Sequence, residues 1–177
     1  MKFLTAALGL TLLVYGAAFA QSPYAGMQQR PIKALSEQQI ADLKAGRGMG
    51  LALAAELNGY PGPAHLLQLA DKLALSDAQR DRINQLFHHI VAEALPIGAK
   101  LIEQEAALDQ KFAARTIRPE DLKVATAQIG ATQAELRTAH LKYHLETAQI
   151  LSAQQMQQYV ILRGYATDMP MQHHHAQ

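Results

Sequence analysis

Apolar residues recur every three or four positions along two long stretches of the chain, and this spacing predicts two amphipathic helices. The first stretch, from residue 76 to about 114, carries the stripe Ile83, Phe87, Ile90, Ala94, Ile97, Leu101, Leu108 and Phe112. The second, from 119 to about 150, carries Leu122, Ala125, Ile129, Thr132, Leu136, Ala139 and Tyr143. The short segment 116–119 between them favours an antiparallel hairpin, in which Pro96 is expected to kink the first helix.

Helix starts are marked by a Leu-Ser-x-x-Gln motif that occurs three times. In such a motif the serine hydroxyl accepts from a main-chain N–H three residues later, and the glutamine side chain reaches back to the serine N–H. The three copies are Leu35, Ser36 and Gln39; Leu75, Ser76 and Gln79; and Leu151, Ser152 and Gln155. We expect a first helix from 36 to about 45, a last one from 152 to Gly164, and shorter ones over 51–57 and 63–73.

The composition agrees with an all-α fold and excludes several kinds of chemistry. Aromatic residues make up 6% of the chain, too few for a typical β-sandwich or barrel. The absence of cysteine excludes disulfides, thiol nucleophiles and cysteine zinc sites. Gly46-x-Gly48-x-Gly50 follows a predicted helix, whereas a dinucleotide fingerprint follows a strand. Without a nucleophile elbow, a His-Glu-x-x-His motif or a P-loop, the sequence gives no support to an enzyme.

The amino terminus resembles a secretory signal. Residues 1–20 carry Lys2, an apolar run and Ala18-Phe19-Ala20, which fits a cleavage site before Gln21; an uncleaved anchor is the alternative. We expect a flexible leader over 21–34, a helical domain over 35–166, a tail over 167–177, and no membrane span after cleavage. Loss of Lys2 from a chain with 16 basic and 15 acidic residues leaves a formally neutral protein, which argues against binding to nucleic acid.

The length of the hairpin raises the question of what covers it. Two helices of roughly 35 residues extend about 50 Å, longer than a compact bundle of this mass. One face should therefore be poorly covered, and a homodimer would bury more of it. Apolar side chains that would contact an unfolded client on such a face are Val91, Leu95, Ile97 and Ile102. The alternative is that the first and last helices bury these side chains.

The signal sequence, the helical hairpin and the motifs at 75–79 and 151–155 together resemble the Spy/CpxP family, whose hallmark is a repeated Leu-Thr-x-x-Gln motif. Serine replaces threonine here, and either hydroxyl can cap a helix. Residues 48–63 and 139–145 also resemble periplasmic heavy-metal sensors of the CnrX and ZraP type. The resemblance implies a cradle-shaped antiparallel dimer in the periplasm. It implies an ATP-independent stress chaperone for unfolded proteins, a modulator of an envelope sensor protein, or a binder or sensor of zinc, copper, nickel or cobalt.

Histidines supply the candidate metal ligands. His140 and His144 are four residues apart, a spacing at which two imidazoles on one helix can share an ion. A hairpin folded about residues 116–117 would place His88 or His89 opposite His144, and Glu93 opposite His140. The alternatives are a hydrogen-bonded core role for His140 and His144 and a solvated face for His88 and His89.

The tail supplies a second group of candidate ligands, which combines thioether and imidazole groups: Met169, Met171, His173, His174 and His175. This combination suits copper or zinc. The alternative is a polar tail that binds no metal. The sequence thus predicts a chaperone that requires no cofactor, with metal binding either coupled to that role or as the main one.

Overall fold

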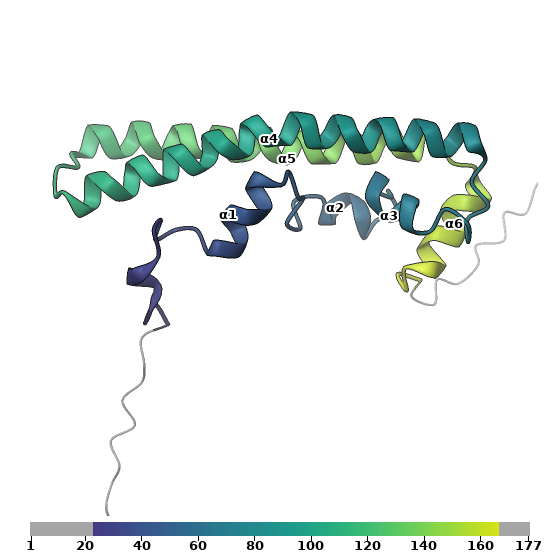
Figure 1. Ribbon diagram of the computed structural model, residues 1–177, viewed down its shortest axis with the longest axis horizontal. Coiled ribbons are helices and arrows are strands. Elements are labelled where there is room, and N and C mark those ends of the chain that lie inside the picture. Colours follow the sequence, from purple (N-terminus) through teal and green to yellow (C-terminus); the bar gives the residue numbers. More distant parts are fainter. Residues whose placement is uncertain (1–22, 167–177) are drawn as a thin grey trace, which may run out of the picture.

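The fold is all-helical, as the sequence predicts. A computed structural model describes residues 23–166, which form six α-helices and one 3-10 turn and contain no strand. Two long helices pack against each other, and the short helices lie along one side of this pair (Figure 1). Residues 1–20 and the tail ligands from Met169 to His175, on which the signal and tail predictions fall, lie outside the described residues.

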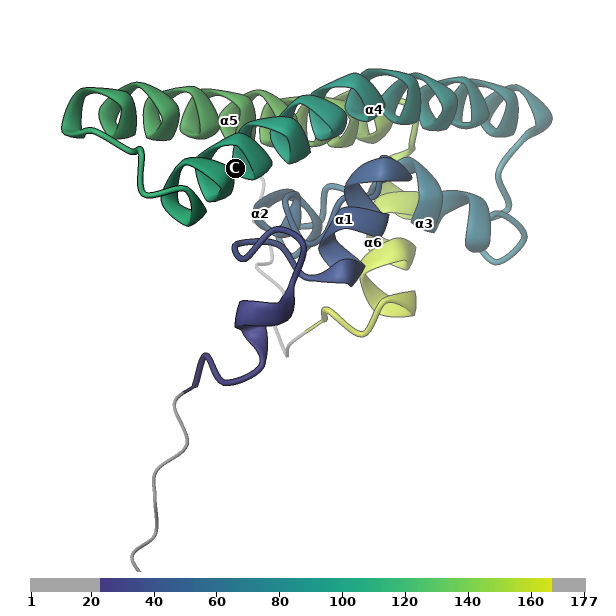
Figure 2. The same ribbon diagram turned by 60° about the vertical axis from the view of Figure 1, so that its left-hand side comes forward.

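The long pair is an antiparallel hairpin. Helix α4 spans Asp77–Ala113 and α5 spans Pro119–Ala148, within two residues of the predicted bounds. The five-residue connection 114–118 turns with Arg115 in the left-handed region, at φ 55°. We call this end of the hairpin the tip, and the opposite end, where α4 begins and α5 ends, the base. Helix α4 continues through Pro96 as one element, and it curves along its length in Figure 2.

Four short helices accompany the hairpin: α1 (Glu37–Lys44), α2 (Leu53–Glu56), α3 (Pro63–Gln68) and α6 (Ala153–Leu162). Helices α1 and α3 pack mainly on α4, and α2 packs on α5. Helices α2 and α3 are shorter than predicted, since turns replace the helical ends expected near 51, 57 and 69–73. The short helices thus form an incomplete layer under the hairpin.

All three predicted capping boxes are present. In each, the serine Oγ accepts from the main-chain N–H of the glutamine, and the glutamine Oε1 accepts from the serine N–H. The first of these distances is 3.1 Å in α1, 3.3 Å in α4 and 3.2 Å in α6. The motif therefore sets where these three helices begin.

The core lies along the middle and the base of the hairpin, in separate clusters of buried residues. Near the middle, Leu43 of α1 packs with the stripes of both long helices, in a cluster that also holds Ile32, Leu35, Ala94, Ile97, Leu101, Ile129, Leu136 and Ala139. Towards the base, Tyr159 of α6 joins Leu66, Ala70, Leu73, Leu75 and Ile83. Because Ile32 is buried, the chain packs onto the hairpin three residues before the predicted start of the domain.

Glycines permit the close approach of the short layer to α4. A Cβ at Gly98 would lie 2.7 Å from the main-chain oxygen of Leu43, so α1 ends directly against this position. Gly46 has a φ of +64°, and a Cβ there would lie 3.3 Å from the main-chain oxygen of Val91. The first glycine of the segment 46–50 therefore allows the chain after α1 to pack closely against α4.

Among the helices in residues 23–166, none combines the length and the apolar character needed to cross a bilayer.

Candidate functional site

A buried carboxylate collects hydrogen bonds near the base. Glu56 of α2 is 5% exposed, and its Oε1 accepts from the hydroxyl of Tyr159, from Tyr165 Oη at 3.2 Å and from His65 Nδ1 at 3.0 Å. Arg163 Nε lies 3.3 Å from the same oxygen. We call Glu56 and these four side chains the Glu56 hub. It connects α2, α3 and the α6 region, so it ties together segments that are far apart in sequence.

The hub keeps Glu56 ionised despite its burial. Burial alone would raise the pKa of this carboxyl, but the Tyr159 hydrogen bond and the nearby His65 and Arg163 outweigh it and hold the pKa below its ordinary value of 4.5. Burial and the bond to Glu56 raise the pKa of Tyr159. The tyrosine therefore stays a hydrogen-bond donor, and Glu56 keeps its negative charge inside the protein beside the positive charge of Arg163.

His140 is a buried imidazole with one partner. Its side chain lies within the α5 core stripe at 3% exposure, and Nδ1 is 2.9 Å from the main-chain oxygen of Leu136. A carbonyl only accepts, so Nδ1 carries a proton, and in the neutral ring Nε2 then presents its lone pair. That Nε2 is buried and has no hydrogen-bond partner among the described residues. A Cβ at Gly48 would lie 3.1 Å from the His140 ring, so this glycine closes over it.

His144 has the same arrangement one turn later. It is 8% exposed, and its Nδ1 donates to the main-chain oxygen of Tyr60 at 2.7 Å. A Cβ at Gly62 would meet the ring at 2.8 Å. Nδ1 is also 3.9 Å from Glu56 Oε2, which places His144 beside the hub. Both histidines thus use Nδ1 to hold their rings in place, with the segment 48–62 packed over them.

Near the middle of the hairpin, the contacts of Glu93 lie two to three residues away from the predicted register. Glu93 binds Lys142 Nζ at 2.8 Å and the hydroxyl of Tyr143 at 2.9 Å, so it lies opposite those residues and not opposite His140. Burial raises the pKa of Glu93, but the hydrogen bonds from Lys142 and Tyr143 lower it by more than burial raises it. The pKa of Glu93 is therefore below its ordinary value of 4.5. The ion pair between Lys100 and Glu135 fits the same shifted register.

The shifted register leaves the predicted ligands apart. His88 and His89 are exposed on α4, whereas His140 and His144 are buried under the short layer. Within residues 23–166, the side chains of His, Asp and Glu form no group of three or more that could hold a metal ion. His140 and His144 therefore supply at most two imidazole nitrogens, and the metal site of the sequence analysis stays a prediction.

Two of the three capping motifs meet at the base. Gln79 Nε2 donates to Gln155 Oε1 at 2.9 Å, and Gln155 Nε2 donates to Gln79 Oε1 at 3.1 Å. Gln79 also donates to the main-chain oxygen of Ile150, and Gln155 donates to that of Leu73. Each glutamine thus caps its own helix and joins the other helix start. The motif fixes α4 and α6 to each other as well as starting them.

The predicted client-binding residues have different environments. Ile97 is 7% exposed and belongs to the core, so its prediction as a surface residue is wrong; α1 packs over this part of α4. Val91 and Ile102 are partly buried against the core. Leu95 is 38% exposed and remains on the surface. The alternative of burial by the short helices therefore holds for most of this set.

The tip carries apolar side chains that the sequence assigned to the helix stripes. Phe112 is 52% exposed and Leu122 is 38% exposed, although each continues the buried stripe of its own helix. Val124 beside them is 57% exposed. Their exposure follows from the layer below, which covers the middle and base of the hairpin but not its tip (Figure 1). The sequence signal for these residues was present, but it was interpreted as core.

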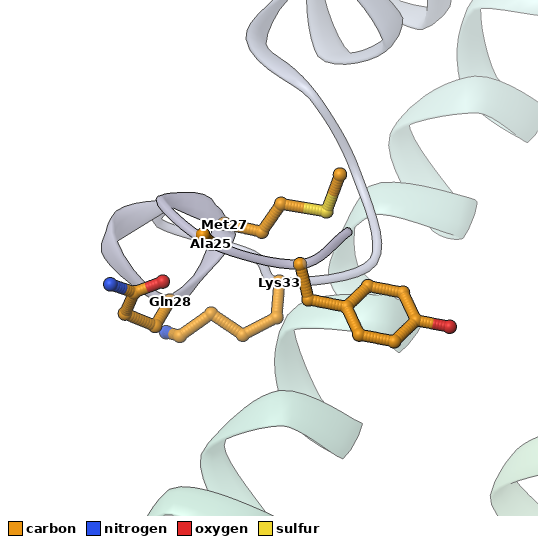
Figure 3. Close-up of a pocket in the computed structure, with 5 residues that line it drawn as sticks. Ala25, Met27, Gln28 and Lys33 are labelled. Carbon is orange, nitrogen blue, oxygen red and sulfur yellow. The ribbon is translucent and has the colours of Figure 1, made fainter. Parts of the chain in front are cut away.

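Two hollows adjoin the tip. One, of about 240 Å³, is a groove between the long helices, lined by Glu103, Gln104, Ala107, Leu108, Lys111, Ala125 and Gln128. The other, of about 510 Å³, lies in the leader and is lined by Tyr24, Ala25, Met27, Gln28 and Lys33 (Figure 3). Lys33 Nζ binds Asp109 Oδ2 at 3.3 Å, which fixes the leader to the tip half of α4.

The Glu56 hub was missed by the sequence analysis. Its only local signal is a single acidic residue inside the apolar run Leu53-Ala54-Ala55-Glu56-Leu57, where a charge in a short helix suggests a buried partner. Its partner Tyr159 is 103 residues away, beyond the reach of any local pattern.

Comparisons with protein-family models, with curated proteins and with solved structures found no match to this chain. The resemblance to Spy/CpxP proteins therefore rests on the Leu-Ser-x-x-Gln motifs and the helical hairpin.

Proposed function

We propose that this protein binds unfolded polypeptides at the tip of its hairpin and holds them without nucleotide, as an exported stress chaperone of the Spy/CpxP type. The proposal rests on one observation. The apolar stripes of α4 and α5 continue beyond the short helices that cover them and end in the exposed side chains of Phe112 and Leu122. Exposed apolar side chains next to shallow grooves suit loosely defined apolar clients better than one shaped ligand.

The surroundings of the tip support this function. Lys111, Arg118 and Asp121 form ion pairs there, whereas Arg115 and Lys123 have no charged partner among the described residues. Mixed charges around an apolar centre allow many sequences to bind weakly and to leave again. The rigid base keeps the tip in place, because the Gln79–Gln155 pair and the Glu56 hub join the short helices to the hairpin.

Suppression of aggregation tests the proposal. An unrelated chemically unfolded protein is diluted into buffer without metal or ATP, and light scattering is followed with increasing amounts of the purified protein. The tip variant Phe112→Ser, Val124→Ser should require about tenfold more protein for half-suppression, because two apolar contacts are removed.

A matched control variant is available on the short helices, away from the tip. Leu53 and Ile161 are 54% and 60% exposed, comparable with the tip pair, but they lie on α2 and α6. Leu53→Ser, Ile161→Ser should suppress aggregation as the unchanged protein does. Equal loss in both variants would exclude the tip as the client site, and no suppression by the unchanged protein would exclude the function.

A second candidate function, binding of a heavy-metal ion, is favoured by the orientation of the two buried histidines. Metal-binding histidines commonly donate their second ring nitrogen to a carbonyl, and His140 and His144 both do so. Two imidazoles are half of a zinc coordination shell, so a complete site needs ligands from outside the described residues, such as the tail or a second chain.

Calorimetric titration of the metal-stripped, tag-free protein with zinc, copper and nickel tests this second candidate. The double variant His140→Ala, His144→Ala and a chain ending at Asp168 separate the hairpin from the tail. Loss of micromolar binding in the double variant alone would assign the site to the hairpin. Loss only in the shortened chain would assign it to the tail and leave the hairpin histidines structural.

A further inference from the structure

The turn after α2 contains the pair Asn58-Gly59. Asn58 is exposed, its Nδ2 donates to the main-chain oxygen of Ala54 at 2.8 Å, and the N–H of Gly59 donates to the main-chain oxygen of Glu56 at 3.2 Å. Gly59 has a φ of +82°, so glycine suits this turn. The next residue, Tyr60, supplies the carbonyl that holds His144. This turn therefore lies between the Glu56 hub and a buried histidine.

We propose that Asn58 is a site of spontaneous deamidation. The main-chain nitrogen of Gly59, after giving its proton to hydroxide, attacks Cγ of Asn58. The Cγ–Nδ2 bond then breaks, the nitrogen takes a proton from water and leaves as ammonia, and a five-membered succinimide forms. Water adds to either ring carbonyl and opens the ring to aspartate or isoaspartate. Glycine favours the attack because it has no Cβ to hinder its nitrogen.

The fold controls when this reaction occurs. The two hydrogen bonds described above hold the attacking nitrogen and the leaving amide on separate carbonyls, so the turn must open before the succinimide forms. Helix α2 has only four residues; Leu53 on it and Leu57 directly after it are 54% and 57% exposed. A turn at the end of so short a helix, with Asn58 itself exposed, opens at a lower free energy than the core does. The rate of deamidation thus reports how often the turn opens.

Deamidation would loosen the contact between this turn and α5. Aspartate places a second negative charge two residues from buried Glu56 and at the C-terminal end of α2, where the helix dipole disfavours it. Isoaspartate adds a carbon to the main chain at position 58, two residues before Tyr60, whose carbonyl accepts from His144. Both products also remove the amide that bonds Ala54.

Peptide mass spectrometry of the full chain tests the modification. Asn84, the other asparagine of the chain, is followed by Gln85 inside α4 and provides an internal control. During incubation at neutral and mildly alkaline pH, Asn58 should deamidate at least about tenfold faster than Asn84, with a rate that rises with pH and with isoaspartate among the products. Equal rates at the two asparagines, or no conversion at Asn58, would overturn the proposal.

Two variants test the structural consequence. Asn58→Asp imitates one product, and Asn58→Ser removes the reactive amide without adding a charge. Hydrogen exchange at residues 59–62 should be faster in Asn58→Asp than in Asn58→Ser. If the two variants exchange at the same rate, the added charge does not release the turn and that part of the inference is wrong. This experiment does not depend on client binding, so its result is independent of the proposed function.

Discussion

The base and the tip of the hairpin are built from the same apolar stripes but differ in what covers them. At the base, Tyr159 and Ile83 are fully buried, and the polar groups of Glu56, Gln79 and Gln155 have partners. At the tip, Phe112 is half exposed. At the base the inward sides of the stripes are covered by the short helices, whereas at the tip stripe residues such as Phe112 remain exposed.

The difference shows that an amphipathic pattern predicts which side of a helix is apolar, but not which part of that side another segment will bury. Periodicity places Phe112 and Ile97 on the same side of α4, yet only Ile97 lies under α1. The extent of the short layer decides which part of a stripe is core.

The largest expected effect is at the Glu56 hub. Replacement Glu56→Ala leaves the buried hydroxyl of Tyr159 without its acceptor and removes the shared partner of the partly exposed His65 and Arg163, so the free energy of unfolding should fall by about 3 kcal/mol. Urea unfolding measures the change. Glu135→Ala, which removes an exposed pair with Lys100, should cost about 0–1 kcal/mol. Similar losses in both variants would show that the hub does not hold the base.

Gln79 tests whether the pairing of motifs matters beyond capping. Gln79→Ala removes the capping box of α4 together with the bonds to Gln155 and Ile150, and should lower the free energy of unfolding by about 2–3 kcal/mol. Gln39→Ala removes a capping box that makes no such long-range bond, so about 1 kcal/mol is expected.

A double-variant cycle on Gln79 and Gln155 isolates their mutual bond. The two losses should not add, because each variant already breaks the reciprocal pair, and a coupling of about 1 kcal/mol is expected. Strict additivity in urea unfolding would mean that the two helix starts are held together by other contacts.

Local signals in the sequence were enough for the helix starts. A serine and a glutamine three residues later satisfy each other within one turn, so Ser36, Ser76 and Ser152 marked helices without knowledge of the fold. The stripe residues likewise identified the two long helices. These features depend on neighbours within about four residues.

The candidate sites depended on contacts that no local pattern contains. The register of the hairpin follows from how the two stripes pack and from the left-handed Arg115 in the connection, so symmetry about residues 116–117 misplaced Glu93. The partners of Glu56 and Gln79 lie in segments distant in sequence. His140 and His144 were identified as a pair, but no local pattern relates Gly48 and Gly62 to the rings that they cover.

Substitution of two helical glycines by alanine distinguishes the effect of close packing from the effect of intrinsic helix propensity. Gly98→Ala places a Cβ 2.7 Å from the Leu43 carbonyl oxygen under α1, so α1 must shift, and a loss of about 1–3 kcal/mol is expected. At Gly130, nearer the tip, a Cβ meets nothing within 4 Å. Gly130→Ala should therefore stabilise the protein by about 0.5–1 kcal/mol. Thermal unfolding of both variants measures the decrease in stability expected at Gly98 and the increase expected at Gly130. A decrease in stability for Gly130→Ala would mean that another part of the protein packs against this position.

The smallest expected effect is the acid dependence contributed by Glu93. Its folded pKa lies below the ordinary 4.5, so the unfolded chain binds its proton first as the pH falls. The stability that Glu93 contributes is fully present above pH 4.5 and is lost progressively below it, as protonation releases Lys142 and Tyr143. Because the carboxylate is 34% exposed, solvent screens the pair and the contribution should be at most about 1 kcal/mol. Urea unfolding at a series of pH values between neutral and acidic should give a shallower acid slope for Glu93→Gln than for the unchanged protein. An identical slope would assign the acid sensitivity to the Glu56 hub, where the lowered pKa of a more deeply buried carboxylate has the same sign.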